Sequence, residues 1–372
     1  MIPPLGGSSQ QNSLDELGHT PHALLMECRY FDELQFSADH IRDIKALGKI
    51  LKDNPEHADL IAQGQRAIIA SDAGELAKLL SSGLAQFGPV YPLLAIKCWH
   101  EEICAAYQRK GIGDQIRIAT LLDIKLWMQA YEKAHDGQTG LEQVYWISRH
   151  LCAKILRLGR LQYEPRIFSQ HVRIYRDNRS ANLLTLAEGN LCCTELGYPA
   201  SEEPASFTTD WYEDATIITA CQVDTLNARI LSKPTTFLKA DLLPLADKNT
   251  EVVFIHIPAE GKLDKEAVDE SLSQAKEQFP SHCLFFCVSW LLDPALLLVA
   301  PQESNIVSFM LRFEKFPVPF QEAQIFERVF AKGLTKEECM LVQPTSSLQA
   351  NIQRELAKGT EFRTIGGFIP CL

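Results

Sequence analysis

A short glycine-containing loop stands where an apolar run gives way to a helical pattern. Residues 251–258 form a continuous apolar segment, and apolar positions then recur at helical spacing over residues 265–279. The loop Ala259–Leu263 would deliver its N–H groups to a helix N-terminus, which is a ready site for an anion such as phosphate. Gly261 admits backbone conformations closed to other residues, and Lys262 adds a positive charge. The same element order also occurs in α/β proteins that hold no ligand there, and both the dinucleotide and the P-loop fingerprints are absent.

Four side chains near this loop are candidates for chemistry. His256 lies on the apolar segment, and its usual pKa suits a general base, the alternative being a half-buried histidine bonded to a backbone carbonyl. Ser289 and Asp293 come at the end of the next apolar segment, where Asp293 precedes a proline and is expected to be a helix N-cap. Cys287 lies inside that segment and is expected to be a buried, unreactive thiol.

The surrounding elements would position these residues. Residues 251–258 and 283–290 both have the continuous apolar character of inner strands. The predicted helix between them begins after Asp264, a suitable N-cap. Two strands connected through a helix are most simply parallel neighbours with a right-handed crossover.

The rest of the chain divides into a helical part and a strand-rich part. Residues 1–20 are rich in Gly, Ser, Gln and Pro and are expected to be mobile, and residues 21–154 show helical periodicity. Strand patterns begin near residue 155 and continue to the opening loop. After the second parallel strand, the patterns predict a short helix over 294–299, a strand over 305–313 and a last helix over 347–358.

Composition limits the possible classes of protein. The 372 residues carry a net charge of −11, which argues against nucleic-acid binding. The N-terminal residues do not form a signal peptide, and no apolar run approaches the length that spans a bilayer. Eleven cysteines without a C-x-x-C pair indicate reduced thiols in the cytoplasm and no structural metal site.

The order of these elements, and several segments, resemble a known family. The order of antiparallel strands, a strand, a phosphate-competent loop, a helix and a parallel strand is that of the GNAT acyltransferase fold. The sequence is similar to bacterial acyltransferase-domain proteins, which have a helical N-acyltransferase-type N-terminal domain and a GNAT-like C-terminal domain. The similarity lies in RKGIGDQIRIATLLDIKLWM (109–128), WISRHLCAKILRLGRLQYE (146–164), VVFIHIPAEGKLDKEAVDESLSQAKEQFP (252–280), FFCVSWLLDPAL (285–296), SNIVSFMLRF (304–313) and SSLQANIQRELAKG (346–359).

The resemblance implies a fold and a domain order. We expect an α+β protein with an all-helical N-terminal domain (21–154), followed by a GNAT-like mixed β-sheet domain with flanking helices (155–330). Residues 331–372 are expected to form a C-terminal extension with one helix.

The resemblance also implies acyl transfer from acetyl-CoA or another acyl-CoA to a small amine or similar acceptor. The pyrophosphate would lie on the amides of Ala259, Glu260, Gly261, Lys262 and Leu263. A backbone N–H near Ile255 to Ile257 would polarise the thioester, with His256, Ser289 and Asp293 as catalytic candidates. Asn305 would contact the pantetheine arm, unless it belongs to an ordinary turn. Neither the acceptor nor the oligomeric state follows from the sequence.

Two departures from the GNAT pattern support an alternative. The loop reads P-A-E-G-K-L, with one glycine and with Glu260, which would repel phosphate unless it points away. The tyrosine that often serves as general acid is missing from residues 294–299. The alternative is therefore a non-catalytic GNAT-fold module that binds a small ligand or a protein partner, and a different enzyme class on the same fold stays open.

Overall fold

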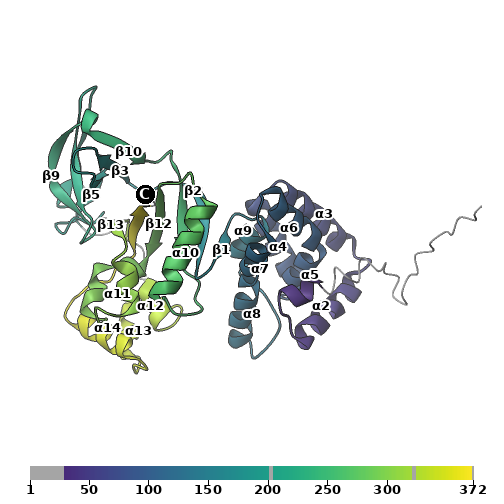
Figure 1. Ribbon diagram of the computed structural model, residues 1–372. Helices are drawn as coiled ribbons and strands as arrows, with labels where there is room; N and C mark the ends of the chain where they lie inside the picture. The colour runs from purple at the N-terminus through teal and green to yellow at the C-terminus, as the bar shows by residue number, and fades with distance from the viewer. Residues whose placement is uncertain (1–28, 201–203, 321–323, 371–372) are drawn as a thin grey trace, which may run out of the picture. The chain divides into compact units, whose positions relative to one another are not determined.

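The chain forms two compact units that divide between Arg157 and Leu158 (Figure 1). The structure is a computed structural model that describes residues 29–200, 204–320 and 324–370. The segment 1–20, which we expect to be mobile, lies outside the described residues. None of the helices in the described parts combines the length and apolar character that crossing a membrane requires.

The first unit is built from helices, as predicted. They are α2 (Ala38–Leu51), α3 (Pro55–Ile69), α4 (Ala73–Phe87), α5 (Tyr91–Cys98), α6 (His100–Arg109), α7 (Asp114–Leu121), α8 (Asp123–Ala134) and α9 (Val144–Leu151). Trp99 separates α5 from α6. Trp99 is fully buried against Gly64, where an added Cβ would lie 2.0 Å from the indole ring. Helical periodicity alone does not reveal such a break.

A six-stranded mixed sheet forms the centre of the second unit, which agrees with the predicted α+β class. Its order is β1-β2-β11-β12-β14-β13, and β11 and β12 are parallel neighbours connected through α10 (Lys265–Gln278). The strands are β1 (Leu156–Leu158), β2 (Leu161–Ile167), β11 (Glu251–His256), β12 (Leu284–Ser289), β13 (Glu314–Pro317) and β14 (Ile365–Pro370).

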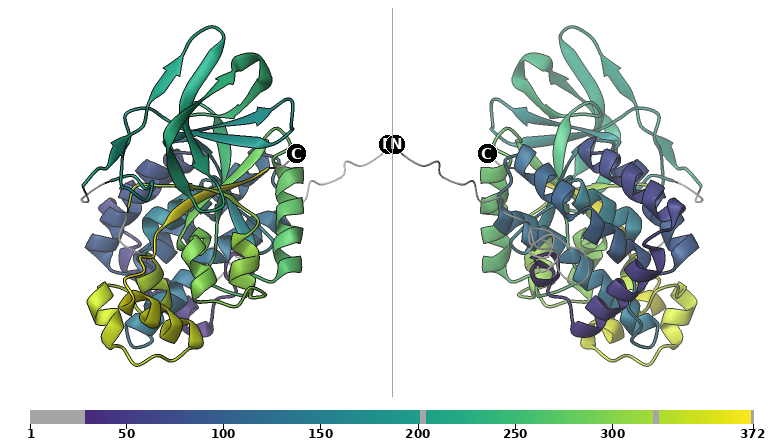
Figure 2. Two further views of the ribbon diagram at one scale, coloured as in Figure 1. Left: turned by 90° about the vertical axis from the view of Figure 1, so that its left-hand side faces the viewer. Right: turned by 90° about the vertical axis from the view of Figure 1, so that its right-hand side faces the viewer.

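A second sheet covers one face of the first. It comprises β3 (Val172–Asp177), β4 (Leu183–Ala187), β7 (Trp211–Glu213), β8 (Ile217–Asp224), β9 (Arg229–Leu238) and β10 (Leu242–Ala246). Between β4 and β7 in the chain, β5 (Cys192–Cys193) and β6 (Phe207–Thr208) form a separate two-stranded sheet. Ile174 from the second sheet packs in one buried cluster with Phe254 and Phe286 from the first. Both views in Figure 2 place the second sheet and the helices α11–α14 at opposite ends of this unit.

The C-terminal part of the second unit differs from the sequence prediction in two ways. Residues 305–310 form the helix α11 (Asn305–Met310) instead of a strand, because Ser304 caps a helix and Val307 and Met310 share its buried side. Over 331–370, the described part of the predicted extension, the structure has two helices, α13 (Lys336–Leu341) and α14 (Ser347–Ala357), and the strand β14 within the main sheet. They are therefore part of the domain core and not an extension. The remaining elements are α12 (Gln324–Val329) and the 3-10 turns η1 (Lys239–Asp241), η2 (Trp290–Leu292) and η3 (Pro294–Leu298).

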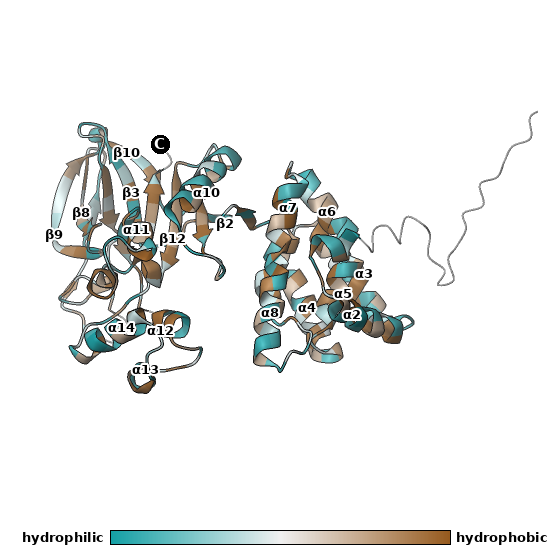
Figure 3. Cartoon of the chain, turned by 60° about the horizontal axis from the view of Figure 1, so that its bottom comes forward, coloured by the Kyte–Doolittle hydropathy of each residue, from teal (hydrophilic) through white to brown (hydrophobic). Residues whose placement is uncertain are grey.

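The crossover helix α10 has one buried side. The sequence predicts an apolar stripe of Val268, Leu272, Ala275 and Phe279, and all but the half-buried Leu272 are buried, together with Ser271. Most of the helix is hydrophilic, whereas the neighbouring strands are apolar (Figure 3). Burial of this stripe on the sheet fixes the start of α10 near the carboxyl ends of β11 and β12, because the chain must return along the sheet to form β12.

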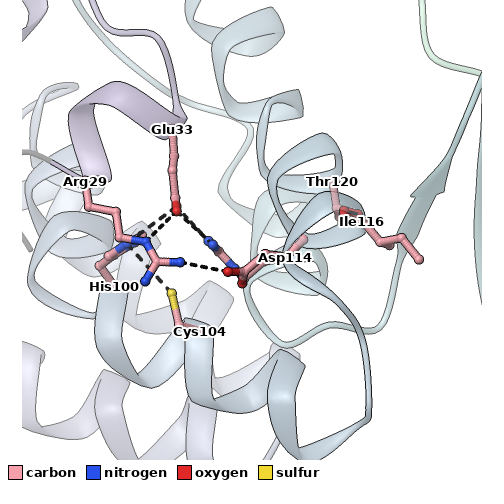
Figure 4. Close-up of polar contacts among 8 residues, drawn as sticks. Arg29, Glu33, His100, Cys104, Asp114, Ile116 and Thr120 are labelled. Atoms are coloured by element: carbon pink, nitrogen blue, oxygen red, sulfur yellow. Dashed lines mark hydrogen bonds and ion pairs between the residues drawn. The ribbon is translucent and has the colours of Figure 1, made fainter.

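A buried ion cluster stabilises the helical unit (Figure 4). Glu33 accepts hydrogen bonds from two nitrogens of Arg117 at 2.7 and 2.8 Å and one from Arg29 at 2.7 Å. Arg117 is fully buried and also donates to Asp114. Burial alone would raise the pKa of Glu33, but the hydrogen bonds from Arg117 and Arg29 outweigh it and hold the pKa at about 2. The carboxylate is therefore charged at neutral pH.

Replacing Glu33 by Gln should destabilise the protein by about 3–5 kcal/mol, because the buried Arg117 loses the carboxylate that binds two of its nitrogens and is left with the exposed Asp114. The effect should be complete above pH 4.5 and decrease as the pH falls toward about 2, since the folded-state pKa is below the ordinary value. Urea unfolding measures the free energy. Glu75→Gln, which removes an exposed i,i+3 pair with Lys78, is the control and should change stability by less than about 1 kcal/mol. Equal effects of the two substitutions would contradict the prediction.

Candidate functional site

The two parallel strands β11 and β12 separate at their carboxyl ends. They pair at Val253–Phe285 and Phe254–Phe286 and at no later position of these strands. Each strand nevertheless continues along its outer neighbour: β11 pairs with β2 as far as His256, and β12 pairs with β14 as far as Ser289. At the ends of both strands, the backbone groups on the sides that face each other therefore make no β11–β12 ladder hydrogen bonds.

The loop that follows β11 is held from one side by an arginine. Arg160, in the turn between β1 and β2, donates to the carbonyls of Pro258 at 3.1 Å, Gly261 at 3.0 Å and Lys262 at 2.9 Å. Gly261 has φ +72°, a conformation that favours glycine. Within the described chain, the amides of Gly261, Lys262 and Leu263 donate to no backbone carbonyl. These three amides are therefore not used by the backbone of the domain.

The start of α10 is also left open. Asp264 occupies the N-cap position, as predicted, but its side chain makes no capping hydrogen bond. Its carboxylate instead accepts from Asn305 Nδ2 at 2.8 Å, which links α11 to α10. Arg312, just after α11, makes an ion pair with Asp269 on α10 and strengthens this link. Because the cap is withdrawn, the first-turn amides of a fourteen-residue helix add to those of the loop.

The structure brings the predicted cofactor-binding residues into one region. Ile255 and Ile257 lie at the end of β11, and Ala259, Glu260, Gly261 and Lys262 are exposed in the loop, while Leu263 is buried. Asn305 reaches the same region through Asp264, although it opens a helix and does not precede a strand as expected. Contact with a cofactor stays a prediction for all of them.

His256 is bonded to a carboxylate. Its Nε2 lies 3.0 Å from Oε2 of Glu164 on β2. The side chain of His256 is 22% exposed and that of Glu164 only 4% exposed, so the imidazole is accessible while its partner is not. Arg166 Nη1 lies 4.0 Å from the same carboxylate oxygen. A buried carboxylate that fixes an accessible histidine is a common arrangement for proton transfer.

Sequence reasoning missed Glu164. Apolar and polar residues alternate over residues 155–163, a pattern that predicts Gln162 on a solvent-exposed face of a strand. In the structure Gln162 is only 1% exposed. Since His256 is the register partner of Gln162 and Phe254 that of Glu164, these side chains share the face that the second sheet covers. Gln162 and Glu164 are polar residues two positions apart in a strand pattern, and the neighbouring strand contains His256. This spacing is the signal that could have found the His256–Glu164 pair.

The candidates after β12 have structural partners. Ser289 Oγ accepts from the amide of Leu291 at 3.1 Å. Asp293 Oδ1 accepts from the amide of Ala295 at 2.9 Å, which confirms the predicted N-cap, and Oδ2 accepts from the amide of Arg363 at 2.5 Å. Burial raises the pKa of Asp293 to about 6, and these hydrogen bonds lower it only in part. Cys287 is buried, which raises the pKa of its thiol to about 12, as expected for an unreactive cysteine.

Comparisons with known proteins agree with this geometry. Residues 155–369, more than half of the chain, match the family model described as a GNAT-like C-terminal domain, and residues 28–153 match the N-acyltransferase N-terminal domain. No curated protein sequence matches the chain.

Solved acyltransferase structures share the fold. A mutant in complex with octanoyl-CoA is 17% identical with a TM-score of 0.59, and the similarity covers 92% of this chain and 87% of that one. An acyltransferase in complex with decanoyl-CoA and teicoplanin is 18% identical with a TM-score of 0.58, covering 99% and 92%. Another in complex with CoA and 10C-teicoplanin is 18% identical with a TM-score of 0.59 over the same shares.

The raised pKa of Asp293 predicts a pH-dependent contribution to stability. The folded state holds this proton more tightly than the unfolded state, so the contribution is fully present below pH 3.8 and is lost as the pH rises through about 6. The free energy of unfolding of the wild type minus that of Asp293→Asn should therefore decline between pH 4 and pH 7. Asn also loses one acceptor, but that penalty does not titrate. Urea unfolding at four pH values measures the difference, and a constant difference would refute the assignment.

Proposed function

Because the chain belongs to the family that has a GNAT-like C-terminal domain after an N-acyltransferase N-terminal domain, we propose that it is an acyl-CoA-dependent N-acyltransferase acting on a small amine or similar acceptor. The separation of β11 from β12 is the observation that carries this proposal. It leaves backbone donors and acceptors between two strands, where an extended pantetheine arm can pair as a strand would.

In this proposal the donor lies along the site in a defined direction. The pyrophosphate rests on the loop Ala259–Leu263 and the first turn of α10, where the amides of Gly261, Lys262 and Leu263 donate to no backbone carbonyl and the Asp264 side chain does not cap the helix. The pantetheine arm lies between the ends of β11 and β12, with Asn305 beside it. A backbone N–H near Ile255 to Ile257 polarises the thioester carbonyl.

Proton transfer is assigned to the His256–Glu164 pair. The acceptor nitrogen attacks the thioester carbon, and His256 takes the proton that the nitrogen loses. Collapse of the tetrahedral intermediate breaks the carbon–sulfur bond, and the CoA thiolate leaves with the electron pair. The protonated His256 can then return its proton to the thiolate, so a tyrosine acid is not required. Ser289 and Asp293 shape the end of β12 beside the thioester.

The alternative is a binding module without turnover. It is favoured by the loop itself, which has one glycine and an exposed Glu260. Such a module would bind CoA or another small ligand and release no product. The acyltransferases of similar fold were solved with eight- and ten-carbon donors, so donors of this length belong in the test beside acetyl-CoA.

Thermal unfolding with CoA and acyl-CoAs tests donor binding. A ligand at about 100 times its dissociation constant stabilises the folded state by roughly 2.7 kcal/mol. Gly261→Glu should abolish the shift, because it strains a φ of +72° and places a side chain 3.7 Å from Arg160 Nε, where its carboxylate competes with the loop carbonyls for the guanidinium. Gly333→Glu is the matched control, with φ +83° and nothing within 4 Å of an added Cβ, and should keep the shift. Wild-type protein that is unaffected by millimolar ligand would refute donor binding.

Release of free CoA thiol over a panel of amines tests turnover. His256→Ala should lower kcat/KM by about 10²–10⁴-fold while leaving CoA affinity unchanged, since it removes a base and not a phosphate contact. Glu164→Gln should give a smaller loss. His282→Ala is the control, because it breaks a second His–Glu pair, with Glu251 at the start of β11. Donor binding without thiol release would establish the binding module instead.

A further inference from the structure

The turn between β1 and β2 controls the shape of the phosphate-facing loop. Arg160 is the residue of that turn that reaches the loop, and its guanidinium binds three loop carbonyls. The carbonyls belong to the peptide units Pro258–Ala259, Gly261–Lys262 and Lys262–Leu263. Every peptide bond in the described chain is trans. In a planar trans peptide, the C=O and the N–H point in opposite directions.

The direction of the amides follows from this geometry. Since three carbonyls point toward Arg160, the N–H groups of Ala259, Lys262 and Leu263 point away from it. These are amides of the loop to which we assign the pyrophosphate. Arg160 therefore holds these three donors on the face of the loop opposite the guanidinium, where an anion would lie.

The position of Arg160 is itself fixed by α10. Ser271, which is fully buried on α10, donates to the carbonyl of Leu158 and accepts from the amide of Leu161 at 3.1 Å. The hydroxyl of Tyr163 lies 3.0 Å from the same Ser271 oxygen. The β1–β2 turn, α10 and the loop thus form one hydrogen-bonded unit, and the loop cannot change shape without breaking contacts to Arg160.

We propose that Arg160 is a positioning residue for the pyrophosphate of the acyl donor and takes the place of a glycine-rich loop. This inference rests on the proposed function. A glycine-rich loop turns its amides outward through flexible residues, whereas this loop has one glycine and its carbonyls are held inward by a guanidinium. Lysine could not replace it, because an ammonium group lacks the planar fork that reaches three carbonyls at once. The guanidinium also places a permanent positive charge behind the loop.

Calorimetric titration with CoA and with pantetheine, which lacks all the phosphates, tests the assignment. Arg160→Met should weaken CoA binding by about tenfold or more, the equivalent of losing one charge-assisted hydrogen bond, while pantetheine binding stays unchanged. Arg160→Lys should weaken CoA binding nearly as much. Arg179→Met is the control, since Arg179 is exposed and pairs with Asp241 in the turn η1 before β10, and this variant should bind both ligands as the wild type does.

Four other results of these titrations would contradict the positioning role of Arg160 or the proposed function. Equal loss of CoA and pantetheine binding would show a general structural defect and overturn the positioning role. Full CoA affinity in Arg160→Met would overturn the inference and leave the proposed function intact. Wild-type affinity in Arg160→Lys would show that charge, and not loop shape, is what matters. Wild-type protein that binds no CoA would overturn the proposed function and this inference together.

Discussion

The geometry of the second unit depends on two strands that are each held more strongly by an outer neighbour than by one another. β11 has six register pairs with β2, and β12 has six with β14, whereas β11 and β12 share two. The separation of β11 from β12 therefore loses few ladder hydrogen bonds. The outer ladders keep both strands extended past the point where they separate. Unpaired backbone groups away from water are costly, which makes this place receptive to an extended ligand.

The second sheet changes the character of the neighbouring face. Without it, Gln162 and Glu164 would lie on a wet sheet surface, and the Glu164 carboxylate would orient His256 only weakly. With it, Glu164 is almost fully buried, and His256 at the strand end keeps partial access to solvent. A buried carboxylate beside a partly exposed imidazole is better fixed than two exposed groups, because fewer side-chain conformations are available to it.

Local patterns predicted the strand, loop, helix and strand around Gly261, because each element has an unambiguous period and a clear boundary. They also made His256 a candidate and predicted the N-cap role of Asp293, which depends on a neighbour two residues away. The partner of His256 lies 92 residues away, and its identity depends on register, which a single sequence does not encode locally. The prediction of a strand over residues 305–313 was wrong for a different reason. The helix α11 is only six residues long, which is too short for a helical period to be distinguished from a strand period.

The position of β14 has a consequence for how the domain is made. This strand is inserted between β12 and β13, although the chain forms α13 and α14 before reaching it. During synthesis, β12 must therefore wait with one edge unpaired until residues 365–370 have left the ribosome. An apolar strand with an open edge is the usual starting point for wrong pairing between chains. The central sheet can close only late, and the nascent protein depends on that closure to remain free of aggregation.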